Sequence, residues 1–228
     1  MPRVRIVLVR PEAPVNVGAA ARIVRNTGLS GLDLVDPGDW RTVECWRTAW
    51  GAHEVLEEAR VFADLAGAAA SAAYVVAFTG RREKGVPSLD VRDAAAEAAG
   101  LAPEDEAALV FGPETSGLSQ DELALCGRRA FIPSHPDQPS LNLSHAVMVA
   151  AYEVFRTKGR TLPGPRCATH AEKEALLGLL RDGLLALQAL PADETESYFR
   201  EWRALVQRAD LTPRELRLLE HMARKMAR

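Results

Sequence analysis

The stretch VLVRPEAPVNVGAAARIVRNTG, residues 7–28, holds a strand, a turn and a helix in close succession and predicts the type of fold. An apolar run ends at a proline-rich elbow, and a helical pattern follows from Asn16 to just before Gly28. Asn16 can cap this helix, and Gly18 in its first turn would let a ligand approach the backbone. Arg22 stands one turn further along and would point back over the helix start. The segment fits either a capped helix with a surface arginine or a phosphate site.

The same alternation of apolar runs and helical patterns continues as far as residue 155. Near-continuous apolar runs are typical of strands buried on both faces, so we expect an α/β fold, a mostly parallel sheet with helices on both faces. In such sheets ligands bind in the loops beyond the carboxyl ends of the strands. The expected strands cover residues 4–9, 32–35, 74–78, 107–111 and 129–132. The expected helices cover residues 16–26, 63–72, 91–99 and 142–155, and Ser119 would cap a further short helix.

The composition changes near residue 159, and this change gives the domain boundaries that we expect. Residues 1–158 would form the α/β domain, and residues 159–169, which begin with a Gly- and Pro-rich stretch, would form a linker. Residues 170–228 show helical periodicity alone and predict a small all-helical C-terminal extension. Its expected helices cover residues 171–190, 195–209 and 213–226, the last of them capped by Thr212.

Bulk composition excludes several classes of protein. The 228 residues are 47% hydrophobic and 26% charged, as in an ordinary globular protein. No run of about 18 apolar residues predicts a membrane span, and the chain starts with a basic strand rather than a signal peptide. The cysteines are few and widely spaced and no C-x-x-C occurs, so we expect no disulfide framework, no metal site and a location in the reducing cytoplasm.

The net charge of −3 is unevenly distributed along the chain. Up to residue 155 the acidic side chains outnumber the basic ones, and beyond it the balance is reversed. A chain that is acidic overall is a poor non-specific binder of nucleic acid. The basic tail indicates either contact with a polyanion or a solvated helix face.

Several familiar motifs are absent. In the segment GPETSGLS, Leu118 occupies the place of the phosphate-binding lysine of a P-loop, and no G-x-G-x-x-G follows the first strand. The adjacent Ser144 and His145 lack the G-x-S-x-G turn of a hydrolase and fit packing within a helix better. The sequence therefore offers no standard nucleotide or hydrolase signature.

Three segments keep a functional interpretation. The first is the helix start that holds Asn16 and Arg22. In the second, LVFGPETSGL, a buried strand leads into a loop with Gly112 and Glu114, which fits a backbone cradle for a small molecule as well as a plain turn. In the third, IPSHPDQPSLNLSHA, Ser140 and Asn142 begin a buried helix and can either cap it or bind a polar ligand.

Together, in this order and spacing, the three segments resemble the motifs of the SPOUT family of RNA 2′-O-ribose methyltransferases, of the TrmH/SpoU type. The opening RPEAPVNVGAAARIVRNTGL and the tail QRADLTPRELRLLEHMARKM are especially similar to the family's TrmJ branch, whose members methylate the ribose at position 32 of the tRNA anticodon loop. The resemblance extends over nearly the whole chain.

The resemblance implies a homodimer that uses S-adenosyl-L-methionine without a metal, and a chain threaded around residues 111–155 into a trefoil knot. Arg22 would be the catalytic arginine, and its companions around the substrate would be Asn16, Glu114, Ser140 and Asn142. The cofactor would lie, mainly through backbone groups, against Thr79, Gly80, Arg81, Gly112, Ile132, Pro139, Ser140 and Leu141.

The expected function is therefore transfer of a methyl group to the 2′-hydroxyl of nucleotide 32 in tRNA. A same-family enzyme acting on rRNA or on the tRNA wobble position, a nucleotide-binding hydrolase and a non-catalytic RNA-binding scaffold are the alternatives. Arg22 would act either as a base or by positioning the substrate, and either in its own or in the partner subunit's site. A free arginine has a pKa above about 12, which favours positioning.

Overall fold

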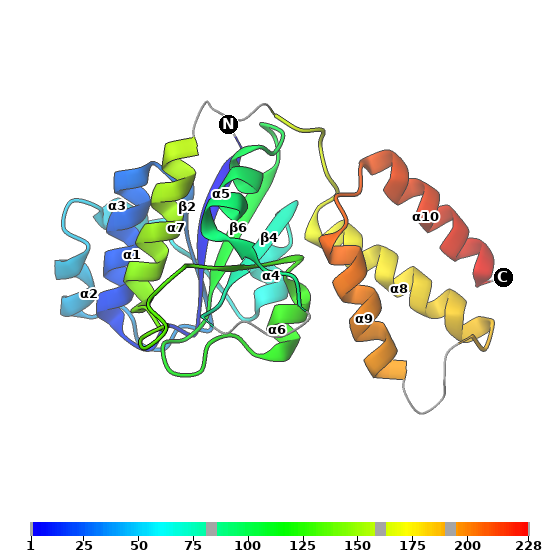
Figure 1. The fold of residues 1–228 in the computed structure, drawn as a ribbon, viewed down its shortest axis with the longest axis horizontal. Coiled ribbons are helices and arrows are strands. Elements are labelled where there is room, and N and C mark those ends of the chain that lie inside the picture. Colours follow the sequence, from blue (N-terminus) through cyan, green and yellow to red (C-terminus); the bar gives the residue numbers. More distant parts are fainter. Residues whose placement is uncertain (1, 81–85, 158–162, 190–194, 228) are drawn as a thin grey trace.

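The computed structural model describes residues 2–80, 86–157, 163–189 and 195–227. Within these residues the centre is a seven-stranded sheet in the order β3-β2-β1-β6-β4-β7-β5, and every paired strand is parallel to its neighbour (Figure 1). Because the strands run the same way, their carboxyl ends lie along one edge of the sheet. The strands are β1 (Arg3–Val9), β2 (Gly31–Val35), β3 (Arg60–Phe62), β4 (Tyr74–Phe78), β5 (Leu89–Asp90), β6 (Glu106–Phe111) and β7 (Arg128–Phe131).

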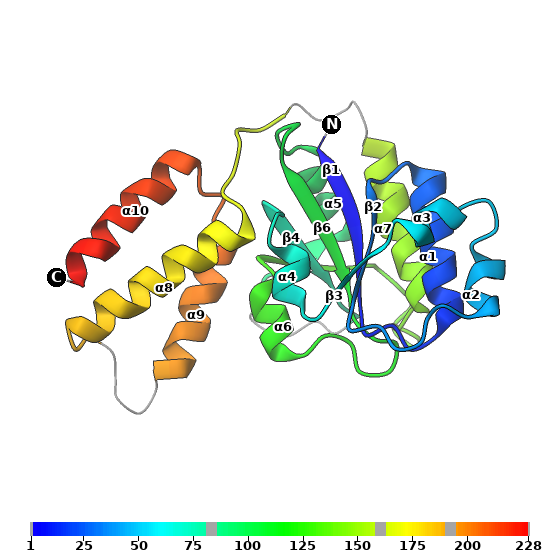
Figure 2. The same cartoon turned by 180° about the vertical axis from the view of Figure 1, so that it is seen from behind.

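Helices cover both faces of the sheet (Figures 1 and 2). One face carries α1 (Pro14–Thr27), α5 (Val91–Ala99) and α7 (Leu143–Thr157), which also pack against one another. The other face carries the short helices α4 (Leu65–Ala69) and α6 (Gln120–Leu125). The expected α/β fold with helices on both faces is therefore confirmed.

Alternation along each strand divides the apolar side chains between two cores. In β1, Ile6 and Leu8 belong to the core under α1, α5 and α7. Val7 and Val9 belong to the core under α4 and α6. All four side chains are fully buried, which explains why the sequence of this strand reads as a continuous apolar run.

Several expected elements are confirmed, and others differ. The strand at 74–78 and the helices at 91–99 and 213–226 have the expected bounds, and Ser119 and Thr212 cap their helices. Other expected elements differ at their ends: the first helix and several strands are one or more residues longer, the strand expected at 129–132 is β7, and the helix expected at 63–72 is the shorter α4.

The start of α1 corrects one prediction. Asn16 is not the cap, because the helix begins two residues earlier at Pro14 and the cap position is Ala13, whose side chain makes no capping hydrogen bond. Proline favours the first helical turn, since its φ is already helical and it has no amide proton to leave unpaired. The side chain of Asn16 is thus free to bond elsewhere.

The sequence did not predict the elements between β2 and α4. Here α2 (Val43–Thr48) and α3 (His53–Glu57) pack against the outer side of α1, and β3 adds the edge strand next to β2. The strand β5 was also missed. Elements of two to six residues are too short to show a periodic pattern.

The C-terminal helices α8 (His170–Ala186), α9 (Thr195–Arg208) and α10 (Pro213–Met226) pack around an apolar core of their own. They contact the rest of the chain where α9 packs against α6 and at the start of α8. There the amides of His170 and Ala171 donate to the carbonyls of Ala72 (2.7 Å) and Ala70 (3.1 Å) just after α4.

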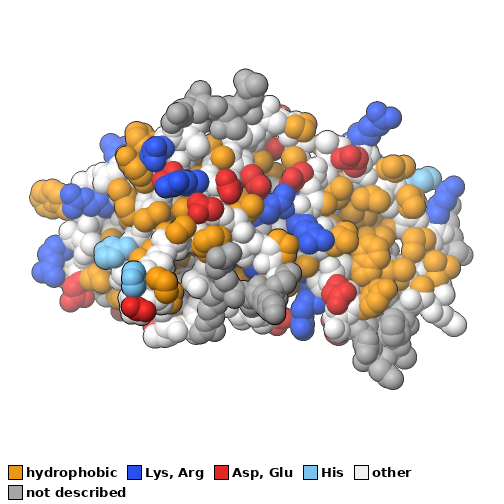
Figure 3. Space-filling view, viewed as in Figure 1, with side chains coloured by type: hydrophobic (Ala, Val, Ile, Leu, Met, Phe, Trp, Pro, Cys, Tyr) orange, Lys and Arg blue, Asp and Glu red, His pale blue; other side chains and the backbone are white. Residues whose placement is uncertain are grey.

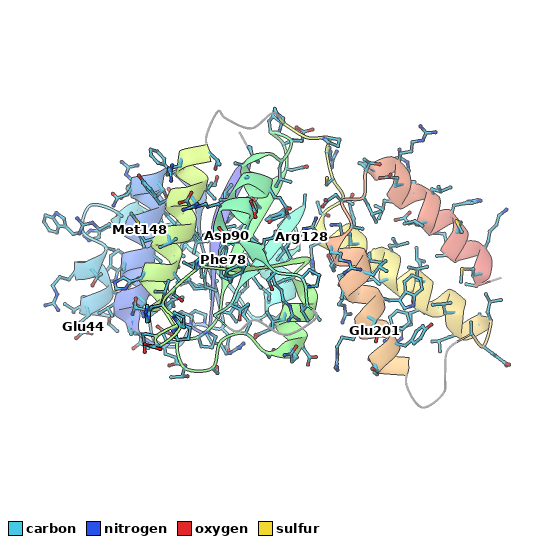
Figure 4. All side chains as sticks on the ribbon, viewed as in Figure 1. Glu44, Phe78, Asp90, Arg128, Met148 and Glu201 are labelled. Carbon is cyan, nitrogen blue, oxygen red and sulfur yellow. The ribbon has the colours of Figure 1, made fainter. Side chains whose placement is uncertain are left out.

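Arg128 joins the same contact from β7 (Figure 4). Its guanidinium donates to the carboxylates of Glu97 (3.2 Å) and Asp210 (2.9 Å) and to the carbonyl of Arg208. The division of the chain into domains at 158 and 170 stays a prediction, as does the knot, because strand order alone does not establish threading. In the described part of the chain, no helix is long and apolar enough to cross a membrane.

A buried carboxylate ties the first three strands together. Asp33 of β2 is 1% exposed and accepts two hydrogen bonds from Arg5 of β1 (2.5 and 2.8 Å) and two from Arg60 of β3 (2.7 and 2.8 Å). Burial would raise the pKa of Asp33, but the bonds from the two guanidinium groups outweigh it and lower the pKa below its ordinary value.

We expect Asp33→Ala to lower the free energy of unfolding by roughly 3–5 kcal/mol, because it leaves the largely buried Arg5 without a counter-charge. Urea unfolding at pH 7 measures this. Arg60→Ala is the control and should cost less, since the Arg60 side chain is 42% exposed. Equal losses in the two variants would contradict the assignment of Asp33 as the buried centre of the cluster.

Candidate cofactor and substrate site

The loops that follow β4, β6 and β7 meet at the carboxyl edge of the sheet and line a cavity of about 390 Å³. The rings of Phe78 and Phe111, the last residues of β4 and β6, lie nearly parallel at 4.8 Å and line it (Figure 4 labels Phe78). Cavities of this size suit a small organic ligand. The other lining residues are Thr79, Gly80, Gly112, Pro113, Glu114, Thr115, Ser116, Gly117, Leu118, Gln120, Leu123, Ile132, Pro139, Ser140, Leu141, Leu143 and Ala146.

The structure brings the sequence-predicted cofactor residues together at this cavity. Each predicted residue that is described lines it, namely Thr79, Gly80, Gly112, Ile132, Pro139, Ser140 and Leu141. Arg81 lies outside the described residues. Their role in binding stays a prediction, and the structure supplies its geometry.

Gly112 has a specific steric reason to be glycine. A Cβ atom at this position would lie 2.5 Å from the amide nitrogen of Leu118, because the loop folds back on itself. Gly117 completes the return with a φ of +68°, a conformation that favours glycine. At these two glycines the loop therefore presents its backbone to the cavity.

The opposite side of the cavity is formed by the loop between β7 and α7. Within it the hydroxyl of Ser134 donates to the carbonyl of Pro139 (2.9 Å). That carbonyl lies 3.7 Å from where a Cβ of Gly80 would be, so the loop after β4 runs against this one. Two loops distant in sequence thus close one end of the cavity.

Glu114 joins the cavity loop to the start of α1. Its carboxylate accepts hydrogen bonds from the amides of Glu12 (2.9 Å) and Ala13 (3.2 Å) and from Nδ2 of Asn16 (2.6 Å). Burial alone would raise the pKa of Glu114, but these donors outweigh it and lower the pKa below its ordinary value. The two predicted residues Asn16 and Glu114 therefore lie together, bonded to each other.

Sequence reasoning missed two further links between the same loops. Arg10, which follows β1, forms a two-pronged ion pair with Glu122 of α6 (2.5 and 2.9 Å), and the hydroxyl of Thr115 donates to Glu12. The only signal in the sequence was the S-x-x-E pattern of Ser119 and Glu122, which marks a capping box but not a bond to Arg10.

Asn142 and Ser140 stand at the entrance to α7. The Oδ1 atom of Asn142 accepts from the amides of Ser144 (2.9 Å) and His145 (3.4 Å), so this side chain caps the helix. Asn142 is exposed and is not among the residues that line the cavity, whereas Ser140 is exposed and does line it. The structure therefore places Asn142 beside the cavity rather than in its wall.

Arg22 is separate from the cavity of its own chain. It lies on α1, is exposed, and is not a lining residue. Its side chain makes no hydrogen bond and no ion pair with the described residues. Of the predicted residues that the structure describes, Asn142 lies beside the cavity and Arg22 lies apart from it, open to solvent.

Gly18 corrects another expectation. The space beside it, predicted to admit a ligand, is occupied by α2 of the same chain: a Cβ at Gly18 would lie 2.2 Å from the carbonyl oxygen of Cys45. The Cys45 thiol is buried there, and burial raises its pKa to about 11. Gly18 therefore permits close packing of two helices.

Comparison with known proteins gives a consistent result. Residues 3–152 match the SpoU rRNA Methylase family. A curated relative from Pseudomonas aeruginosa, named tRNA (cytidine/uridine/adenosine-2′-O-)-methyltransferase TrmJ, is 36% identical over 98% of this chain and 85% of its own.

Solved structures of methyltransferases are also similar to this chain. The crystal structure of TrmJ from Z. mobilis is 32% identical, covers all of both chains and superposes with a TM-score of 0.85. An AdoMet-bound rRNA methyltransferase from Sinorhizobium meliloti is 26% identical over 68% of this chain and 56% of its own, with a TM-score of 0.54.

We expect Glu114→Gln to lower the free energy of unfolding by about 1.5–3 kcal/mol at pH 7. Both carboxylate oxygens of Glu114 accept hydrogen bonds, and glutamine replaces one of these oxygens with an NH2 group, which is a donor. The lowered native pKa of Glu114 gives a stabilisation that is present above pH ~4.3 and is lost as the pH falls through the native pKa. The difference between wild type and variant should therefore shrink in acid.

Urea unfolding at a series of pH values measures this difference. The matched control is Glu57→Gln, which removes an exposed carboxylate at the end of α3. A stability loss in Glu114→Gln that stays constant down to pH 3 would contradict the role of the charge.

Proposed function

The chain belongs to the SpoU rRNA Methylase family, and on that basis we propose that it is an S-adenosyl-L-methionine-dependent methyltransferase that acts on the ribose 2′-hydroxyl of nucleotide 32 in the tRNA anticodon loop. We further propose that it works as a homodimer in the cytoplasm. The observation that carries the proposal is the cavity at the carboxyl edge of the sheet, where the loops after β4, β6 and β7 converge.

The cavity is suited to the cofactor. The stacked rings of Phe78 and Phe111 and the backbone of the Gly112 loop offer an apolar surface with polar edges, as an adenosine group requires. The bound cofactor would supply an electrophilic methyl group on a sulfonium. Transfer would exchange the carbon–sulfur bond for a bond to the 2′-oxygen, and the hydroxyl proton would pass to water.

The chain's own residues have to hold the hydroxyl in line and stabilise the charge that develops on its oxygen. Ser140 lines the cavity three residues before α7, and we assign it to bonding the ribose of the substrate. Glu114 and Asn16 bond to each other and to the backbone, so we assign them to positioning the cavity loop against α1. Asn142 fixes the first turn of α7 in the same way.

Arg22 would position the 2′-hydroxyl and the neighbouring phosphate. A guanidinium with no partner in the described part of its own chain is available for this. Because it does not line its own cavity, we propose that it serves the cavity of the partner subunit.

An exposed apolar stripe on α7 supports a dimer on this side of the molecule. Met148, Tyr152 and Phe155 are 39%, 47% and 46% exposed and follow one another at helical spacing, on a helix that packs against α1 (Figure 4 labels Met148). Association over this stripe would remove apolar surface from water and bring α1 of one subunit to the other.

The substrate is tested by incubating the protein with radiolabelled S-adenosyl-L-methionine and with total tRNA and total rRNA in parallel. We expect label in tRNA alone, and nuclease digestion should place it on the ribose of nucleotide 32. Label at the wobble nucleotide or in rRNA would replace the proposed substrate, and absence of both label and S-adenosylhomocysteine binding would favour a non-catalytic scaffold.

The role of Arg22 is tested with mixed dimers. We expect Arg22→Ala to lower turnover by about 100-fold or more while S-adenosylhomocysteine binding, measured by calorimetry, is retained. Gly112→Val should abolish cofactor binding, because its side chain meets the loop backbone. A purified heterodimer of the two inactive variants should regain about half of the wild-type activity if Arg22 acts across the dimer. No recovery would place Arg22 in its own subunit's site.

A further inference from the structure

Trp50 is 73% exposed, although tryptophan is normally well buried. It sits at the tip of a tight turn, residues 49–52, in which the amide of Ala52 donates to the carbonyl of Ala49 (2.8 Å). Gly51 has a φ of +77°, the value that a type II turn requires at its third residue. Both alanines are buried, so the turn is anchored and holds the indole ring out into solvent.

This turn lies beside Arg22. Gly18, Arg22 and Arg25 follow one another at helical spacing along one face of α1. Gly18 touches the carbonyl of Cys45 in α2, and Arg25 forms an ion pair with Glu54 in α3 (3.1 Å). Arg22, which lies between these two contacts, therefore faces the turn that connects α2 to α3.

Two further arginines surround the same corner. Arg41 precedes α2 and lies over the ring of Trp40 (5.0 Å), and Arg47 is exposed on α2. Neither guanidinium has a carboxylate partner in the part of the chain that the structure describes. Figure 3 shows basic side chains next to apolar ones at this end of the molecule, on the left.

We propose that Trp50 stacks on an unpaired base of the RNA loop adjacent to the nucleotide being methylated, and that Arg47 and Arg41 bind the neighbouring phosphates. The inference rests on the proposed function and adds the residues that recognise its single-stranded substrate. A flat ring offers a stacking surface to any base, and unpaired guanidinium groups match the charge of the backbone. A second copy of this chain would meet the apolar stripe on α7, where Arg156 is paired with Glu153 (3.5 Å). Arg41 and Arg47 have no such partner among the described residues, so RNA is the better match for the Trp50 corner.

Steady-state methylation of tRNA tests the proposal with Trp50→Leu and Trp50→Phe. Leucine keeps an apolar side chain but removes the ring, and we expect it to raise the KM for tRNA roughly 5- to 100-fold, with a smaller change in kcat. Phenylalanine keeps a ring and should recover most of the affinity. Arg47→Ala should flatten the dependence of log affinity on log salt by about 0.7, the loss of one phosphate contact to a single strand.

Each other outcome overturns the inference in a recognisable way. Wild-type activity together with an unchanged KM in Trp50→Leu overturns the inference and leaves the proposed function intact. Equal defects in the leucine and phenylalanine variants, or a change in oligomeric state by sedimentation, would make the corner a protein contact instead. No methylation of any RNA by the wild type would overturn the proposed function and the inference together.

Discussion

The carboxylate of Glu114 connects the two halves of the candidate site. It belongs to the loop that lines the cavity, and it binds amide protons at the open end of α1, where a helix has donors without intrahelical partners. Asn16 adds a third donor from inside the helix. Arg10 with Glu122 and Thr115 with Glu12 are further links between the segments on either side. The start of α1, the helix that carries Arg22, is therefore tied to a residue of the cavity wall.

The sequence allowed the layered α/β fold to be predicted, because parallel strands buried on both faces give continuous apolar runs. Residues 74–78 are all buried, and the pattern gave their bounds without error. The two-residue β5 left no periodic signal. The contacts of the site residues were harder to predict, because the sequence does not show which partner a glycine or an asparagine meets in the fold. Gly18 proved to accommodate Cys45 of its own chain.

Asn16 illustrates the same limit, since its bond to Glu114 spans 98 positions and no local rule contains it. The loops that line the cavity were identified from their place after strands, which is a property of topology. The separation of Arg22 from the cavity could not have been foreseen, because it depends on which side of α1 packs against α2. The residue types thus indicated which side chains belong to the candidate site, whereas the packing of the helices determines where each of them lies.

The contact at the start of α8 has a consequence for how the molecule is held together. The first amides of a helix have no acceptor within the helix, and those of α8 donate to carbonyls that follow α4. Without this contact, both the amides and the carbonyls would have to bond water. Arg128, which also bonds Glu97 on its own side, adds a bond to Asp210 across the same boundary. The placement of the C-terminal helices is therefore encoded in non-covalent complementarity and not in the covalent connection to α7. We therefore expect the two pieces of a chain cut in that connection to stay associated through these contacts.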